Sequence, residues 1–215
     1  MNAAPGPRLM RPSAVPCSVY REMPHEMTAA DIAEIVEGYR LSARYAREGG
    51  LDGVEVHSMS HGYLLNQFLS PATNHRKDAF GGSIENRARL MFEVVDAAIR
   101  VFGAGRIGLR ISPLNSYNHM RDSDPVGITN YVAAQCQRRG IAYLHLMRGD
   151  FFGAQKADVV HPARENFRGA LVGNMGYTPA EAAAEVTAGT LAAVAFGHHY
   201  VSNPDLVERV KAGVT

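Results

Sequence analysis

Gly53-Val-Glu-Val-His57 and Ile107-Gly-Leu-Arg-Ile111 are short apolar runs separated by a segment with helical periodicity, which Ser83 can cap and Gly103 can end. The same alternation of run and helix recurs at Ala142-Tyr-Leu-His-Leu146, Ala170-Leu-Val172 and Ala192-Ala-Val-Ala-Phe196. Strands that alternate with helices predict parallel βαβ units. The pattern alone does not distinguish an open doubly wound sheet from part of a barrel.

The other helices are predicted from their end signals. Thr28 and Asp31 have the spacing of a capping box, and Gly49-Gly50 can close that helix. We also expect helices at 129–139, after Thr178-Pro179, and at 205–211. Residues 1–26 contain five prolines and are predicted to be an irregular lead-in, so that 27–215 form one domain.

The composition narrows the class of protein. The 215 residues are 46% hydrophobic and 20% charged, with a net charge of +1, which is typical of an ordinary globular domain. No basic cluster predicts nucleic-acid binding, and no apolar run predicts a membrane segment. Cys17 and Cys136 are too few for a disulfide framework, so we expect two reduced thiols and a cytoplasmic protein.

Four of the five predicted strands end in a polar residue or a glycine. They end at His57, at Arg110, at Gly173-Asn174 and at Gly197-His198. In βα folds the carboxyl ends of the strands build the active site. These residues are therefore candidates for a site, although a single turn or packed position of this kind is common.

The segment 57–63 concentrates groups suited to carbonyl chemistry. His57 and His61 can donate imidazole N–H groups to a carbonyl oxygen, and the Tyr63 phenol can deliver a proton. Two histidines four residues apart can also bind zinc when they lie on a helix, but the preceding run is strand-like and no third ligand is evident, so we predict no metal. Plain loop packing is the other alternative.

The remaining strand ends predict anion binding. Arg110 should meet an anion or an electron-rich ring edge, or else a carboxylate such as Glu55 in a buried salt bridge. Backbone N–H groups near Gly173, Asn174, Gly176 and Gly197 can bind a phosphate, although ordinary turns look the same.

Several of these segments resemble the old yellow enzyme family. The resemblance is carried by the strand that ends at His57, by His61-Gly-Tyr-Leu-Leu-Asn-Gln-Phe-Leu-Ser-Pro71, by Phe80-Gly-Gly-Ser-Ile-Glu-Asn-Arg-Ala-Arg89, by Ile107-Gly-Leu-Arg-Ile-Ser-Pro113 and by Ser202-Asn-Pro-Asp-Leu206. It implies a (β/α)8 TIM barrel that binds FMN, takes a hydride from NAD(P)H and reduces activated C=C bonds of α,β-unsaturated carbonyl compounds.

The resemblance also implies roles for individual residues. His57 and His61 would hold the carbonyl oxygen, and Tyr63 would protonate the α-carbon. Arg110 would lie against the pyrimidine edge of the flavin. Gly173, Asn174, Gly176 and Gly197, with His198 in place of the family's usual arginine, would receive the FMN phosphate.

Two departures from the family pattern bear on function. Ser58, Met59 and Ser60 separate the two histidines, whereas the family usually has two residues there. The chain also contains about five βα units, so it predicts a partial barrel without the first strands. A barrel closes with eight, so we expect the isolated chain to associate with itself, to pair with a complementing chain, or to fold poorly. The alternative function is a non-catalytic remnant or a partner-dependent subunit of such an enzyme.

Overall fold

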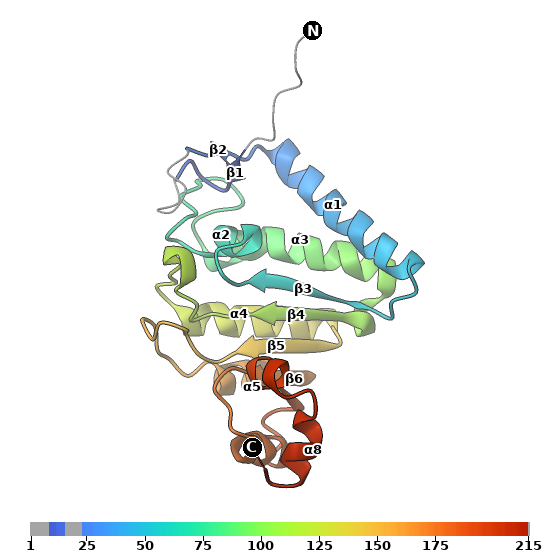
Figure 1. Cartoon of the computed structure of the whole chain (residues 1–215). Coiled ribbons are helices and arrows are strands. Elements are labelled where there is room, and N and C mark those ends of the chain that lie inside the picture. The colour runs from blue at the N-terminus through green and yellow to red at the C-terminus, as the bar shows by residue number, and fades with distance from the viewer. Residues whose placement is uncertain (1–8, 16–22, 215) are drawn as a thin grey trace.

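The computed structural model describes residues 9–15 and 23–214. Its main sheet has five strands: β3 (Val54–Met59), β4 (Ile107–Ile111), β5 (Tyr143–Met147), β6 (Ala170–Asn174) and β7 (Ala193–Ala195). All neighbouring pairs are parallel, and their spatial order is the order along the chain. A doubly wound sheet would reverse its order at a switch point. The sheet is therefore part of a barrel wall, as the family resemblance predicted (Figure 1).

Helices alternate with these strands. They are α1 (Ala29–Glu48), α2 (Leu64–Leu69), α3 (Ile84–Phe102), α4 (Pro125–Arg139), α5 (Val160–Asn166), α6 (Pro179–Thr187), α7 (His198–Ser202) and α8 (Leu206–Lys211). Short 3-10 turns lie at Ala104–Arg106 and Tyr117–His119. Within the predicted lead-in, β1 (Met10–Arg11) pairs in parallel with β2 (His25–Glu26).

The helix ends follow from local side chains. The Thr28 hydroxyl and the Asp31 carboxylate form the predicted capping box of α1, and Ser83 caps α3 through the Asn86 N–H. The helix predicted from residue 129 begins at Pro125 instead. Asp124 accepts a hydrogen bond from the Gly127 N–H there, and proline is favoured in the first turn, so the helix gains four residues over the prediction.

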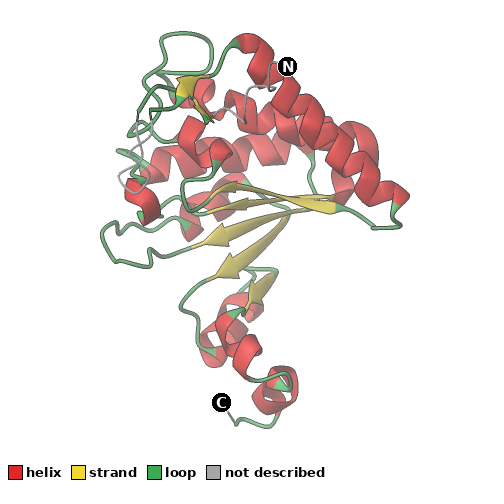
Figure 2. Cartoon of the chain, turned by 45° about the horizontal axis from the view of Figure 1, so that its top comes forward, coloured by secondary structure: helices red, strands yellow, loops and turns green. Residues whose placement is uncertain are grey.

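The two faces of the sheet differ in polarity. Val56, Leu109, Leu144 and Leu171 are buried in one core with residues of α1, α3 and α4. Strand side chains alternate, so the opposite face, here called the inner face, carries the intervening residues Glu55, His57, Gly108, Arg110, Tyr143 and His145. Figure 2 places the long helices α1, α3 and α4 on one side of β3–β5, and no described helix covers the inner face of these strands.

A buried arginine connects the N-terminal segment to the loop before α3. The Arg76 side chain donates to the Pro12 and Met27 carbonyl oxygens at 2.8 and 2.7 Å, and it pairs with Asp78. The guanidinium therefore joins residues that are far apart in the chain.

Both cysteines were expected to be reduced thiols. Cys136 is a free thiol in α4, and burial raises its pKa to about 12, so it stays protonated. Cys17 lies outside the described residues. Among the helices in the described ranges, none combines the length and the apolar composition needed to cross a membrane.

Replacing Arg76 with methionine tests the connection that this guanidinium makes. The change removes the donors that satisfy two buried carbonyl groups, so we expect the free energy of unfolding to fall by roughly 2–4 kcal/mol. Urea denaturation would measure the loss. Arg106→Met is the matched control, because the Arg106 side chain is exposed and pairs only with exposed Asp52. Equal stability of the two variants would contradict the structural role of Arg76.

Candidate functional site

A β-bulge at the end of β3 accommodates the unusual spacing of the two histidines. His57 lies opposite Arg110 on β4, but Ile111 on β4 lies opposite Met59 rather than Ser58. Ser58 is therefore the additional residue in β3, and it is fully buried. Its hydroxyl donates to the Arg110 carbonyl oxygen at 2.8 Å. The extra residue is absorbed within the strand before the turn to His61 begins.

A tight turn then presents His61. The Tyr63 N–H donates to the Ser60 carbonyl oxygen at 3.1 Å, and His61 and Gly62 have φ values of +53° and +76°. A left-handed conformation at a residue other than glycine costs roughly 1–2 kcal/mol. Asn118 offsets part of this cost, because its side-chain amide donates to the His61 carbonyl oxygen at 2.8 Å. The turn fixes the backbone at His61.

The structure brings His57, His61 and Tyr63 together, as the sequence predicted. Each imidazole ring centroid lies 5.9 Å from that of Tyr63. Partial burial and the charge of Arg110 lower the pKa of both histidines. A protonated His61 lowers the pKa of His57 further, whereas the charge of Glu55 acts to raise it. Both imidazoles are therefore neutral at pH 7 and can act as N–H donors. The zinc alternative required a helix here, but His57 is on a strand and His61 is in a turn.

Arg110 lies on the inner face beside a cavity of about 310 Å³. Its guanidinium donates to the Asn174 side-chain oxygen at 3.1 Å, and the Asn174 amide donates to the Ala195 carbonyl oxygen at 2.9 Å. The Arg110 Nε atom is buried and has no hydrogen-bond partner among the described residues. The salt bridge to Glu55 that we considered does not form, because Glu55 pairs with His145 instead. Arg110 thus keeps a donor for a ligand.

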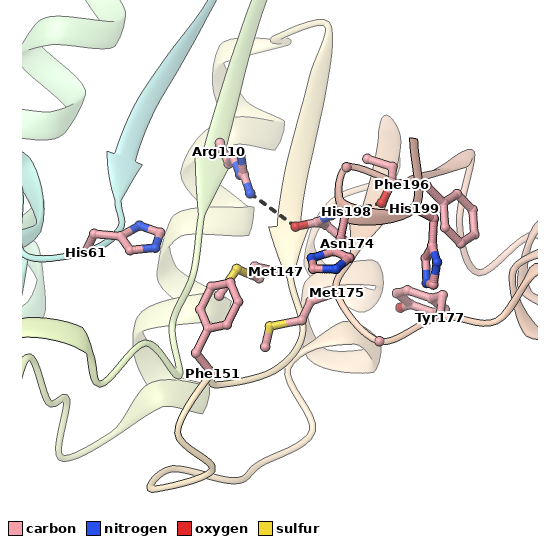
Figure 3. Close-up of a pocket in the computed structure, with 13 residues that line it drawn as sticks. His61, Arg110, Met147, Phe151, Asn174, Met175, Tyr177, Phe196, His198 and His199 are labelled. Atoms are coloured by element: carbon pink, nitrogen blue, oxygen red, sulfur yellow. Dashed lines mark hydrogen bonds between the residues drawn. The ribbon is translucent and has the colours of Figure 1, made fainter. Parts of the chain in front are cut away.

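The cavity unites most of the predicted anion-binding residues. His61, Arg110, Asn174, Gly176, Gly197 and His198 line it (Figure 3). Gly176 and Gly197 are exposed, and a Cβ at Gly197 would meet nothing within 4 Å, so the backbone there is accessible. Gly173 is different: a Cβ there would lie 2.6 Å from Leu191 Cδ1, which makes it a packing glycine behind the cavity.

Sequence reasoning missed several lining residues and one residue that holds them in place. Met147, Phe151, Met175, Tyr177 and His199 also line the cavity. Arg148 donates to the Met175 and Gly176 carbonyl oxygens at 3.0 and 2.7 Å and pairs with Glu181. The sequence carried a signal for Arg148. β5 ends at Met147 rather than at the predicted Leu146, so Arg148 is the polar residue that follows this strand.

Aromatic side chains from two loops surround His61 at the mouth of the cavity. The His61 ring lies 5.3 Å from Tyr117 and 6.0 Å from Phe151, and Tyr117 stacks on Phe152. Asp150 holds the two loops together, since its carboxylate accepts hydrogen bonds from the Ser116 N–H at 3.0 Å and the Ala154 N–H at 2.8 Å. The site can therefore admit a flat, partly apolar molecule next to the imidazoles.

Across residues 9–15 and 23–214, no three His, Cys, Asp or Glu side chains gather closely enough to bind a metal ion. The groups that do gather are neutral imidazoles, a phenol, a guanidinium and accessible backbone amides. This set suits a carbonyl compound and an anionic, planar cofactor.

Comparison with known proteins agrees with this chemistry. The profile of the NADH:flavin oxidoreductase / NADH oxidase family matches residues 5–215. A probable flavin mononucleotide-dependent alkene reductase of Leishmania infantum is 45% identical over 99% of this chain and 61% of its own length. Two solved structures share the fold. Morphinone reductase in complex with tetrahydroNAD is 36% identical, with a TM-score of 0.89 over 98% of this chain and 61% of that protein.

The old yellow enzyme from Trypanosoma cruzi is 32% identical, with a TM-score of 0.92 over 97% of this chain and 60% of that protein. The chain therefore spans about three fifths of the length of the relatives that it matches.

Replacing Ser60 with alanine tests how the turn orients His61. The buried Ser60 hydroxyl is hydrogen-bonded to His61 Nδ1. If the hydroxyl donates, the proton of the neutral ring is on Nε2. We expect Ser60→Ala to mix the two tautomers, as measured by ¹⁵N chemical shifts of the imidazole. Ser42→Ala on α1 is the control and should leave the shifts unchanged. A pure Nδ1–H tautomer in the unaltered protein would contradict the assignment.

Proposed function

Because this chain belongs to the NADH:flavin oxidoreductase / NADH oxidase family, which includes the old yellow enzymes, we propose that it functions in an FMN-dependent oxidoreductase. The enzyme would use NAD(P)H to reduce activated C=C bonds of α,β-unsaturated carbonyl compounds. The observation that carries the proposal is the convergence of His57, His61 and Tyr63 beside a cavity that also contains Arg110.

The residues around the cavity fit FMN. The unpartnered Nε of Arg110 provides a donor for the pyrimidine edge of the flavin ring, and positive charge there favours an anionic ring. Asn174, Gly176, Gly197 and His198 line the same cavity, where backbone N–H groups can receive the phosphate. Bound FMN would supply the two-electron redox chemistry between NAD(P)H and the alkene.

The protein's own side chains would bind and protonate the substrate. Neutral His57 and His61 would donate N–H groups to the carbonyl oxygen and stabilise negative charge as it develops there. The Tyr63 ring lies 5.9 Å from each imidazole ring, and its phenol would give its proton to the α-carbon. The Leishmania infantum relative is named an alkene reductase, and morphinone reductase binds tetrahydroNAD, which supports both the reaction class and the nicotinamide donor.

A specific observation favours a partner-dependent subunit as the form in which the chain acts. β3 pairs with β4 and β7 pairs with β6, and neither has a second partner among the described residues. Unpaired strand edges invite pairing with another polypeptide. We propose that further strands complete the barrel by pairing at these edges, and that a complementing chain or a second copy is one way to supply them. The cytoplasmic location expected from the two thiols stays a prediction.

Tyr63→Phe tests the proposed chemistry. The chain would be combined with a polypeptide that supplies the part of the Leishmania infantum relative that it does not match, and then loaded with FMN. Stopped-flow absorption would follow the two half-reactions separately. We expect the variant to lower the rate of alkene reduction roughly 10²-fold and to leave flavin reduction by NAD(P)H intact.

Tyr45→Phe on α1 is the control and should change neither half-reaction, because Tyr45 is exposed and distant in the fold. Equal loss of both half-reactions in Tyr63→Phe would contradict the proton-donor role. An assembly that takes up no FMN would contradict the proposed function itself.

A further inference from the structure

The inner face of the sheet carries a second group of polar side chains below the predicted flavin contact. In the register of the strands, His57, Arg110 and His145 form one row across β3, β4 and β5. The next row is two residues farther from the carboxyl ends of the strands, and it consists of Glu55, Gly108 and Tyr143. The proposed chemistry uses the first two members of the upper row and none of the lower row.

Because Gly108 has no side chain, side chains of β3 and β5 can meet above β4. A Cβ at this position would lie 2.2 Å from Cζ of Tyr143, so the phenol ring occupies the space that a side chain on β4 would fill. Any residue other than glycine would push this ring away. The absence of a side chain at Gly108 is what allows β5 to reach towards β3.

Glu55 completes the connection from the side of β3. Its carboxylate lies 3.0 Å from Nδ1 of His145, although β4 separates their strands. Partial burial acts to raise the pKa of Glu55, but the hydrogen bond with His145, the nearby Tyr143 phenol and the charge of Arg110 hold it below its ordinary value. Burial and the same carboxylate raise the pKa of Tyr143 to about 12. The carboxylate is therefore charged and the phenol is neutral at pH 7.

The titratable and charged groups that face Glu55 come from three strands. β3 contributes His57, β4 contributes Arg110, and β5 contributes Tyr143 and His145. The neighbouring positions on β6 and β7 are Ala170, Val172 and Ala193, which carry no charge. Glu55 is the single acidic residue in the five strands. It is therefore the acidic group of the sheet that acts on the Arg110 guanidinium.

We propose that Glu55 is a positioning residue, which bridges β3 and β5 across Gly108 through His145, beside the Tyr143 phenol, and balances the charge that Arg110 presents to the cavity. This inference rests on the proposed function for the identity of the ligand, but the bridge itself is a property of the protein alone. Removing the carboxylate leaves the Arg110 guanidinium with an uncompensated positive charge in this row.

The test is an NMR titration of the His57 ring in the chain without cofactor. The negative charge of Glu55 favours the protonated form of His57. Glu55→Gln should therefore lower the midpoint of the His57 titration, since the charge of Arg110 remains. Asp52→Asn removes the same charge from a fully exposed side chain just before β3, and it should leave that midpoint where it is. An equal response to both changes would overturn the proposal.

Two further variants separate the bridge from the charge. Glu55→Asp keeps the charge but shortens the reach to His145, so it should largely retain the His57 midpoint while the His145 ring resonances change. Tyr143→Phe removes the phenol that acts to lower the pKa of Glu55 and should raise that pKa, as read from the ¹³C shift of the carboxyl group. An unchanged Glu55 titration in Tyr143→Phe would overturn the bridge, and this mild change covers the case in which Glu55→Gln does not fold.

The flavin gives a second readout that distinguishes the two proposals. In the FMN-loaded assembly, Glu55→Gln should shift the reduction midpoint of the flavin to a more positive potential, because less negative charge opposes the reduced, anionic ring. If the flavin potential is unaltered while the His57 titration shifts, the electrostatic effect of Glu55 reaches His57 but not the ligand. That result would overturn the proposed influence of Glu55 on the ligand. Failure to bind FMN would contradict the proposed function, whereas the His57 titration would still decide the bridge.

Discussion

The parallel register of β3 against β4 is the constraint on which the site depends. It places His57 opposite Arg110 and directs both side chains to the inner face, while Val56 and Leu109 enter the core beneath the helices. Strand side chains alternate, so a shift of one residue would exchange the polar and apolar faces and bury a guanidinium among leucines. The bulge at Ser58 alters the register only after this pair, which explains how an extra residue is tolerated without losing the site.

The same constraint connects the two levels of the inner face. The upper row offers donors to a ligand, and the lower row holds a carboxylate that faces those donors. A half-buried guanidinium is costly unless something meets its charge. Asn174 and the proposed ligand meet it from the cavity, and Glu55 acts on it from below. The polarity of this face is in keeping with the proposed function, because a face that only had to be filled would be apolar.

Much of the fold could be predicted from sequence, because its signals are local. Capping residues such as Thr28 and Ser83 and the apolar strands gave the element order, and the family resemblance gave the barrel. The short helices α2, α5 and α7 were missed, since five to seven residues carry too little periodicity to recognise. The histidines and Tyr63 came from one contiguous motif. The ion pair of Arg148 with Glu181 and the bridge from Glu55 to His145 could not be found from a contiguous motif, because their partners are 33 and 90 residues apart in the sequence.

The central claim is that Arg110 provides the ligand-facing charge of a flavin site built on this register. The most direct measurement is an equilibrium titration with FMN, followed by flavin fluorescence, of the completed assembly with Arg110→Met or with Arg106→Met. Loss of a charged hydrogen bond should weaken FMN binding at least roughly 10-fold in Arg110→Met. Arg106→Met removes the same charge from an exposed side chain far from the cavity and should bind FMN as the unaltered protein does. Equal affinity of the two variants would contradict the account.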